Sequence, residues 1–149
     1  MYDAQTAPIN VGIFISHSWS YSDHYERLSE WLFIRRWNHR GRPIIFSDYS
    51  VPKDNPIHFA QNDRELYSAI YAKIAMSNVV VIPTGMYSSY SKWIDKEVRA
   101  AREIRKPILA VDPWGQKRKS SFVLQNSNLT AGWNSESVVS KVWDLFIYG

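Results

Sequence analysis

An acidic side chain and an indole, Trp93 and Glu97, stand four residues apart in the middle of the chain. They belong to a helical pattern, in which residues i and i+4 project from one face, one turn apart. The pattern follows the apolar run Val79–Ile82, whose β-branched residues are typical of a strand buried on both faces of a parallel sheet. Open α/β sheets bind ligands just beyond the carboxyl ends of such strands. We therefore expect the Glu97 carboxyl group to lie in a ligand site, beside the Trp93 ring.

Polar residues also follow the other expected strands. Apolar runs at residues 11–16, 43–46 and 108–111 predict three further strands. Because the carboxyl ends of parallel strands meet at one edge of a sheet, four loops are expected to converge there. These loops are His17–Ser20, Asp48–Pro56, Thr84–Ser91 and Asp112–Gly115. The second of them continues to Asn62, and connections of that length in compact domains are often functional.

Several familiar chemistries lack their residues in this chain. There is no GxGxxG and no GxxxxGK[ST], so the glycine loops that cradle phosphates are absent. A Ser-His-acid triad could be assembled from the loops, but no GxSxG elbow supports one. The chain has no cysteine, and its four histidines show no metal-ligand spacing, so we expect no metal site.

The remaining acid candidate is a single carboxyl group, that of Glu97. Ordinary glycosidases need two, one to protonate the leaving group and one to attack or to activate water. A cationic leaving group removes the first requirement, and nicotinamide on the ribose of NAD is such a group, since it departs neutral without a proton. One carboxylate could then stabilise the oxocarbenium-like transition state or hold the ribose hydroxyls.

The order of expected elements predicts an α/β fold. Strand and helix patterns alternate, which implies a flavodoxin-like three-layer sandwich with a parallel sheet of about five strands and helices on both faces. The first helix is expected from about Ser20 to Trp37, ended by Asn38, His39 and Gly41, and the second begins after the capping pair Asn62 and Glu65. The third is the helix of Trp93 and Glu97, which is expected to end at about Arg105. A short fourth helix is expected around Phe122, and a fifth after a cap at Asn134 or Ser135. Residues 129–133 are expected to form a short edge strand. No linker or repeat divides the chain, so residues 1–149 are expected to form one domain.

Composition narrows the class of protein. Hydrophobic residues make up 45% and charged residues 21%, as in globular proteins. No apolar run approaches the ~20 residues of a membrane span and no signal pattern opens the chain, so we expect a cytoplasmic protein without a membrane partner. The net charge is +4, but no nucleic-acid motif accompanies it, and two of the basic clusters fall near expected helix ends, where cations are favoured. We therefore expect no nucleic-acid partner.

The pattern Ser91-x-Trp93-x-x-x-Glu97 resembles the SxW…E pattern of TIR domains, and the resemblance is closest to the TIR-like ThsB family of the Thoeris antiphage defence. It covers most of the chain. The segments that carry it are Phe14–Trp19, Asp48–Pro52 with Asn55-Pro56, Pro83–Tyr87, Lys106–Ile108 with Pro113–Gly115, and Gly132–Asn134.

The resemblance implies a TIR fold and an enzyme that cleaves NAD, its substrate, with no other cofactor. It also implies a cyclic ADP-ribose isomer as product, which would activate a partner effector protein. By this resemblance Glu97 is the catalytic acid and Trp93 packs in its cleft, while Ser16, His17 and Ser18 line the nucleotide pocket. Asp48–Pro56 resembles the loop that covers the site and mediates self-association of TIR domains.

Other interpretations of these residues remain open. Glu97 could be a solvated helix carboxylate near Arg99 and Arg102, and Trp93 could be core. Asp48 is equally well explained as a turn former, and His17 as a structural residue at a strand end. Tyr87 is expected either to contact the ligand or to cover the helix start.

Two other functions compete with NAD cleavage. One is a non-enzymatic TIR module that acts by homotypic assembly through Asp48–Pro56 and the adjoining helix, for which Glu97→Gln would keep function. The other is a base-exchange or deoxyribosyl-transferring enzyme of similar fold, which substrate profiling with free nucleosides would separate.

Overall fold

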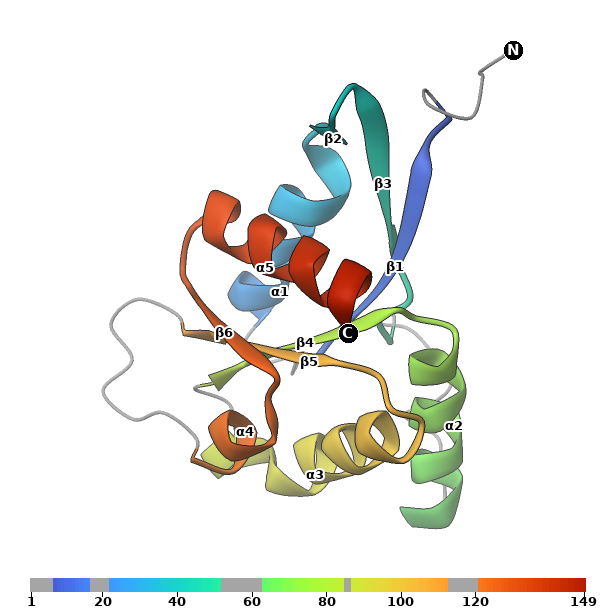
Figure 1. The fold of residues 1–149 in the computed structure, drawn as a ribbon. Coiled ribbons are helices and arrows are strands. Elements are labelled where there is room, and N and C mark those ends of the chain that lie inside the picture. Colours follow the sequence, from blue (N-terminus) through green and yellow to red (C-terminus); the bar gives the residue numbers. More distant parts are fainter. Residues whose placement is uncertain (1–6, 17–21, 52–62, 85–86, 113–120) are drawn as a thin grey trace.

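The computed structural model describes residues 7–16, 22–51, 63–84, 87–112 and 121–149 (Figure 1). Of residues 22, 63 and 87–92 it describes the backbone alone. Within these ranges a six-stranded sheet has the order β2-β3-β1-β4-β5-β6. The strands are β1 (Ile9–Ile15), β2 (Trp37–His39), β3 (Arg42–Asp48), β4 (Val79–Pro83), β5 (Ile108–Asp112) and β6 (Leu129–Gly132). All neighbours pair in parallel except β2 and β3.

Helices cover both faces of this sheet (Figure 1). They are α1 (Ser22–Ser29), the π-helical turn η2 (Glu30–Ile34), α2 (Asp63–Ala75), α3 (Tyr87–Glu103), α4 (Ser121–Asn126) and α5 (Ser135–Tyr148). α1, η2 and α5 pack on one face, and α2, α3 and α4 on the other. The expected flavodoxin-like α/β sandwich is therefore confirmed. None of the described helices combines the length and the apolar character that crossing a membrane requires.

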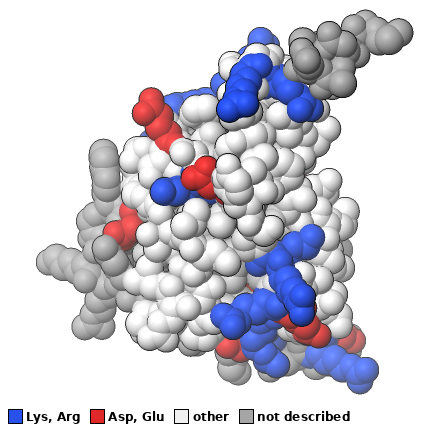
Figure 2. Space-filling model, viewed as in Figure 1, with Lys and Arg blue, Asp and Glu red and all other residues white. Residues whose placement is uncertain are grey.

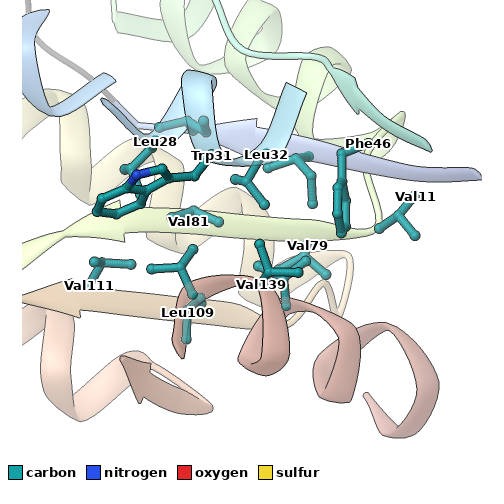
Figure 3. Close-up of a cluster of buried hydrophobic side chains, with 14 of the residues drawn as sticks. Val11, Leu28, Trp31, Leu32, Phe46, Val79, Val81, Leu109, Val111 and Val139 are labelled. Carbon is teal, nitrogen blue, oxygen red and sulfur yellow. The ribbon is translucent and has the colours of Figure 1, made fainter. Parts of the chain in front are cut away.

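The first core lies between the sheet and the helices α1, η2 and α5 (Figure 3). Val81 of β4 and Leu109 of β5 project into it from the sheet, and Leu28 and Leu32 meet them from the helical side. Both faces of β4 and β5 are buried, which explains their near-continuous apolar sequences.

The second core positions the candidate site. Ile94, Val98 and Ala101 of α3 recur at helical spacing and are buried against the other face of the sheet. Glu97 lies three residues after Ile94 and one before Val98, so its side chain falls on the same buried stripe. The fold thus directs one carboxyl group of α3 inward with its apolar neighbours.

The prediction of a helix reaching Trp37 is wrong. The helical segment ends at Ile34, and Trp37–His39 forms an edge strand antiparallel to β3. Arg40 and Gly41 both have positive φ, +50° and +82°, as in the two-residue turns that match the twist of hairpin strands. The Trp37 Nε1–H donates to the Trp31 carbonyl oxygen at 2.6 Å and ties this hairpin to η2. Asn38, His39 and Gly41 therefore shape a hairpin instead of ending a helix.

The remaining element predictions differ from the structure by a few residues at their ends. The short helix around Phe122 and the edge strand at Leu129 are present, and the last helix is capped by Asn134, whose Oδ1 accepts from the Ser137 N–H at 2.8 Å. Asn78, expected in a strand, precedes β4. There its Oδ1 accepts from the Gly12 N–H at 2.7 Å and its own N–H donates to the Gly12 carbonyl oxygen at 2.7 Å. Asn62, expected to cap α2, lies outside the described residues.

Candidate functional site

The Glu97 carboxyl group is buried in the middle of α3. The residue is only 1% exposed, so the interpretation as a solvated helix carboxylate is wrong. Its Oε1 accepts a 2.5 Å hydrogen bond from the Trp93 Nε1–H, one turn earlier on the same helix. Its Oε2 is buried and has no hydrogen-bond partner among the described residues. Oε1 is therefore held in place, whereas Oε2 has no hydrogen-bond donor among the described residues.

Burial changes the acidity of this group. Loss of solvation raises the pKa of Glu97 to about 8, against an ordinary value of 4.5, while Ser16 and Trp93 act in the lowering direction. The side chain is consequently mostly protonated at neutral pH. Strongly shifted carboxyl groups of this kind are frequent in functional sites.

Ser16 approaches Glu97 from the sheet. It follows β1 directly, is 1% exposed, and its N–H donates to the Val81 carbonyl oxygen at 2.8 Å. Its hydroxyl lies near enough to lower the pKa of Glu97, yet the geometry is not that of a hydrogen bond, and Oγ has no partner among the described residues. A buried polar atom without a partner costs about 1–3 kcal/mol. Ser16 Oγ and Glu97 Oε2 are thus two neighbouring buried polar atoms without a partner among the described residues.

Thr84 and Asp112 occupy the same edge of the sheet. Thr84 follows β4 and is buried, and Asp112 ends β5. The Thr84 hydroxyl donates to Asp112 Oδ1 at 3.5 Å, a long hydrogen bond. The ends of three neighbouring strands, β1, β4 and β5, thus bring polar side chains to one edge, as expected from the sequence.

Asp48 uses both carboxylate oxygens within the protein. Oδ1 accepts from the Ser50 N–H at 2.8 Å, and Oδ2 accepts a short hydrogen bond from the Tyr25 hydroxyl of α1. Ser50 Oγ in turn accepts from the Ile15 N–H at 2.8 Å. The interpretation of Asp48 as a turn former describes these contacts, and its role toward a substrate stays a prediction. These hydrogen bonds link α1 and the start of the loop after β3 to Ile15, the residue before Ser16.

The other predicted site residues cannot be placed beside Glu97. His17, Ser18 and residues 52–56 of the Asp48–Pro56 loop lie outside the described residues. Tyr87 begins α3, but its side chain is not among those described. Trp93 is half-buried and packs against the second core, so it is both a core residue and the hydrogen-bond donor to Glu97. No three His, Cys, Asp or Glu side chains come together as a metal site within the described parts of the chain.

Sequence reasoning missed Ser50 and Tyr25 as members of this network. The spacing Asp48-x-Ser50 is a signal for an Asx turn, in which an aspartate accepts from the backbone two residues on. No local signal points to Tyr25, because its contact with Asp48 depends on how α1 packs beside β3.

Comparison with known protein families matches residues 14–118 of the 149 to the family described as the Thoeris protein ThsB, TIR-like domain. The matched range contains Ser16, Asp48, Trp93 and Glu97. The comparison with curated proteins finds no match.

Proposed function

The chain belongs to the Thoeris ThsB family of TIR-like domains, and on that premise we propose that it is an enzyme that cleaves NAD into nicotinamide and a cyclic ADP-ribose-type signal. The family suggests a module of antiphage defence. The observation that carries the proposed chemistry is the Glu97 carboxyl group, buried, held at Oε1 by Trp93 and open at Oε2 beside Ser16.

Breaking the bond between the ribose C1′ and the nicotinamide nitrogen sends its electron pair to nicotinamide, which leaves neutral. No general acid is needed, and positive charge develops on the ribose. A carboxylate fixed nearby stabilises that charge, since preorganised charges act strongly in a site that excludes water. Glu97 Oε2 and Ser16 Oγ, which have no partner among the described residues, would accept from or donate to the ribose hydroxyls. Capture of the cation by an adenine nitrogen or a ribose hydroxyl gives a cyclic product, and capture by water gives ADP-ribose. The proton that the attacking nucleophile loses would pass to the Glu97 carboxylate.

The catalytic form of Glu97 would be the anion. Its pKa of about 8 in the free protein means that the carboxyl group must lose a proton at neutral pH. The positive charge of the nicotinamide ring favours that loss, because an opposite charge within a few ångströms lowers the pKa of a carboxyl group. Binding of the positively charged substrate and ionisation of Glu97 would therefore support each other.

The product of this reaction would act on a partner effector protein. A cyclic nucleotide released from this site would carry the infection signal to a partner that binds it, as the family resemblance implies. Cyclisation requires the adenine to fold toward the ribose in a site from which water is excluded, and the burial of Glu97 and Ser16 suits that requirement.

Nicotinamide release from NAD tests this function. We expect the protein to release nicotinamide, alone or after addition of extract from phage-infected cells, and Glu97→Gln to lower the rate by at least about 100-fold. The matched control is Glu103→Gln. Glu103 lies on the same helix but is exposed and accepts from the Tyr67 hydroxyl, so the control should keep the activity. Absence of nicotinamide under both conditions, or equal rates for wild type and Glu97→Gln, would exclude the proposal.

Homotypic assembly without catalysis is the second candidate function. The observation that favours it is the use of both Asp48 oxygens in holding the start of the loop instead of facing a ligand. In that case Glu97→Gln keeps antiphage protection in cells, whereas charge reversal at Lys53 or Asp54 abolishes it. The opposite result supports the enzyme.

A further inference from the structure

A basic pocket lies at the edge of the sheet opposite the Glu97 site. It has a volume of about 310 Å³ and is formed where α3, α4 and α5 end, beside the start of β5. Arg102, Arg105 and Lys106 line it together with the side-chain amides of Gln125, Asn126 and Asn128. Figure 2 shows Lys and Arg side chains, with some Asp and Glu side chains among them, at the lower right of the molecule, where α2 and the adjoining part of α3 lie in the same view in Figure 1.

The three cations of this pocket have no close carboxylate partner among the described residues. None of them takes part in an ion pair with a described residue, whereas Arg99, one turn before Arg102 on α3, pairs with Asp95 at 3.7 Å. Arg102 donates to the neutral Asn126 Oδ1 at 2.8 Å, which fixes the guanidinium at the wall without using its charge. No Asp or Glu side chain is among the lining residues.

The negative partial charges at the helix C-termini offset only part of this positive charge. The C-terminus of a helix carries about half a negative charge, so three of them offset about half of the charge on three cationic side chains. A carboxylate on Gly149 would reduce the remaining excess without reversing its sign. Capping of the helices alone therefore leaves the pocket positive.

Arg105 has an unusual backbone conformation just after the end of α3. Its φ is +60°, the left-handed conformation in which a helix commonly ends. The Lys106 N–H donates to the Ala101 carbonyl oxygen at 2.8 Å, which is the hydrogen bond of that ending. Glycine is the usual residue there because it adopts this conformation without strain. The chain instead holds an arginine whose side chain lines the pocket.

We propose that this pocket binds a phosphate-bearing small molecule of about mononucleotide size. Arginines bind phosphate oxygens through pairs of N–H groups, and Lys106 adds a point charge. Asn126 uses its amide on Arg102 and on the Phe122 carbonyl oxygen, and Asn128 Oδ1 accepts from the Ile108 N–H. The Gln125 amide and the Asn128 Nδ2–H groups have no partner among the described residues and offer hydrogen bonds to a sugar or a base, while Pro107 and Ile108 form an apolar part of the wall. The volume lies at the lower end of the range of small-molecule sites, about 300–1,000 Å³, which suits one nucleotide and not a dinucleotide.

The site is separate from the proposed catalytic centre. Ser16 and Glu97 belong to the edge where the parallel strands end, whereas the pocket includes Ile108, the first residue of β5. A ligand there would not contact the reacting ribose. The proposal therefore stands or fails independently of NAD cleavage.

Calorimetric titration of the full chain with ADP at low ionic strength tests the proposal. We expect saturable binding of ADP, and binding of adenosine and of inorganic phosphate that is at least about ten-fold weaker, because each lacks one half of the contacts. Arg105→Gly should weaken ADP binding by at least about ten-fold, since it removes a charge-assisted contact. This variant should fold, because glycine is the preferred residue at that backbone position.

The matched control is Arg40→Gly, which makes the same change at another arginine with positive φ, 50°, in the β2–β3 turn. It should leave ADP binding unchanged. The proposal is overturned if ADP does not bind saturably, if Arg105→Gly and Arg102→Gln bind it as wild type does, or if Arg40→Gly loses as much affinity as Arg105→Gly. Inorganic phosphate that binds as tightly as ADP also overturns it, because the nucleoside would then contribute nothing.

Discussion

The Nε1–H of Trp93 donates a 2.5 Å hydrogen bond to Oε1 of Glu97, one turn further along α3. The i, i+4 spacing makes this contact local, so the indole fixes the carboxyl group without help from another element. The bond also lowers the pKa of Glu97 against the larger raising effect of burial. Trp93 is thus expected to set both the orientation and the ionisation of the proposed catalytic group.

Replacement of Trp93 by phenylalanine tests that role. Phe keeps an aromatic ring but has no N–H, so the pKa of Glu97 should rise further and less of the anion should be present at neutral pH. We expect the rate of nicotinamide release at pH 7 to fall by about ten-fold or more, because one hydrogen bond to a charged group is equivalent to about one to two pKa units.

The pH dependence of the rate separates ionisation from shape. In Trp93→Phe the ascending limb of the profile should move to higher pH, and the rate should approach that of wild type above the new midpoint. A loss of equal size at every pH would show that the indole contributes packing alone.

The raised pKa of Glu97 also predicts a dependence of stability on pH. The folded protein holds this proton up to a pH of about 8, whereas the unfolded chain releases it near the ordinary value of 4.5. Between these values the native state binds more protons, so the free energy of unfolding falls as pH rises, by up to about 1.4 kcal/mol per pH unit from this group. The contribution is fully present below about pH 4.5 and is lost as the pH passes 8.

Urea unfolding of wild type and Glu97→Gln from pH 5 to 9 measures this effect. Glutamine does not titrate, so the difference in unfolding free energy between the two proteins isolates Glu97 from all other groups. We expect that difference to change steadily in favour of the variant as pH rises to about 8 and then to level off. A constant difference over the range would mean that the carboxyl group titrates normally.

The position of Glu97 beside Trp93 on one face of α3 could be predicted from the sequence, but the hydrogen bonds that link Asp48, Ser50 and β1 could not. Ile94, Glu97, Val98 and Ala101 fall on one helical stripe, and the apolar runs of β4 and β5 predicted the strands that this stripe packs against. The contact of Ser50 with Ile15 arises differently. It depends on the register of β1 and β3, in which Ile13 pairs with Asp48, and no local pattern determines a register between distant strands.

The β2–β3 hairpin could not be predicted because its local sequence pattern is ambiguous. Trp31 and Trp37 suit a continued helical pattern as well as they suit a helix followed by a strand, so periodicity could not separate the two. The turn itself is Arg40-Gly41, which lacks the Asn or Asp that makes such turns recognisable. The structure resolves the ambiguity through the hydrogen bond between the Trp37 indole and the Trp31 carbonyl group.

Ser50→Ala tests the link between the loop start and the strand that carries Ser16. The change leaves the buried Ile15 N–H without its acceptor, which costs about 1–3 kcal/mol of folding stability. Ser127→Ala is the matched control, because its hydroxyl donates to the Leu124 carbonyl oxygen at the end of α4, where the residue is half-buried and water can replace the bond. Urea unfolding should show a clearly smaller loss for the control. Similar small losses in both variants would show that the Ile15 N–H finds another acceptor.

Gly12→Ala probes how closely β1 is covered in the middle of the strand. A Cβ atom on Gly12 would lie 2.7 Å from Cε2 of the Tyr49 ring and 3.3 Å from the Met76 carbonyl oxygen, so the ring must move. Overpacking of this kind costs about 1–3 kcal/mol. Gly132→Ala in β6 is the control, since its nearest neighbour, Asn134 Nδ2, is 3.7 Å away and its φ is not positive. We expect thermal unfolding at a lower temperature for Gly12→Ala and an unchanged or higher one for Gly132→Ala. Restoration of stability by the additional change Tyr49→Leu would assign the loss to the ring, whereas no restoration would assign it to the backbone contact with Met76.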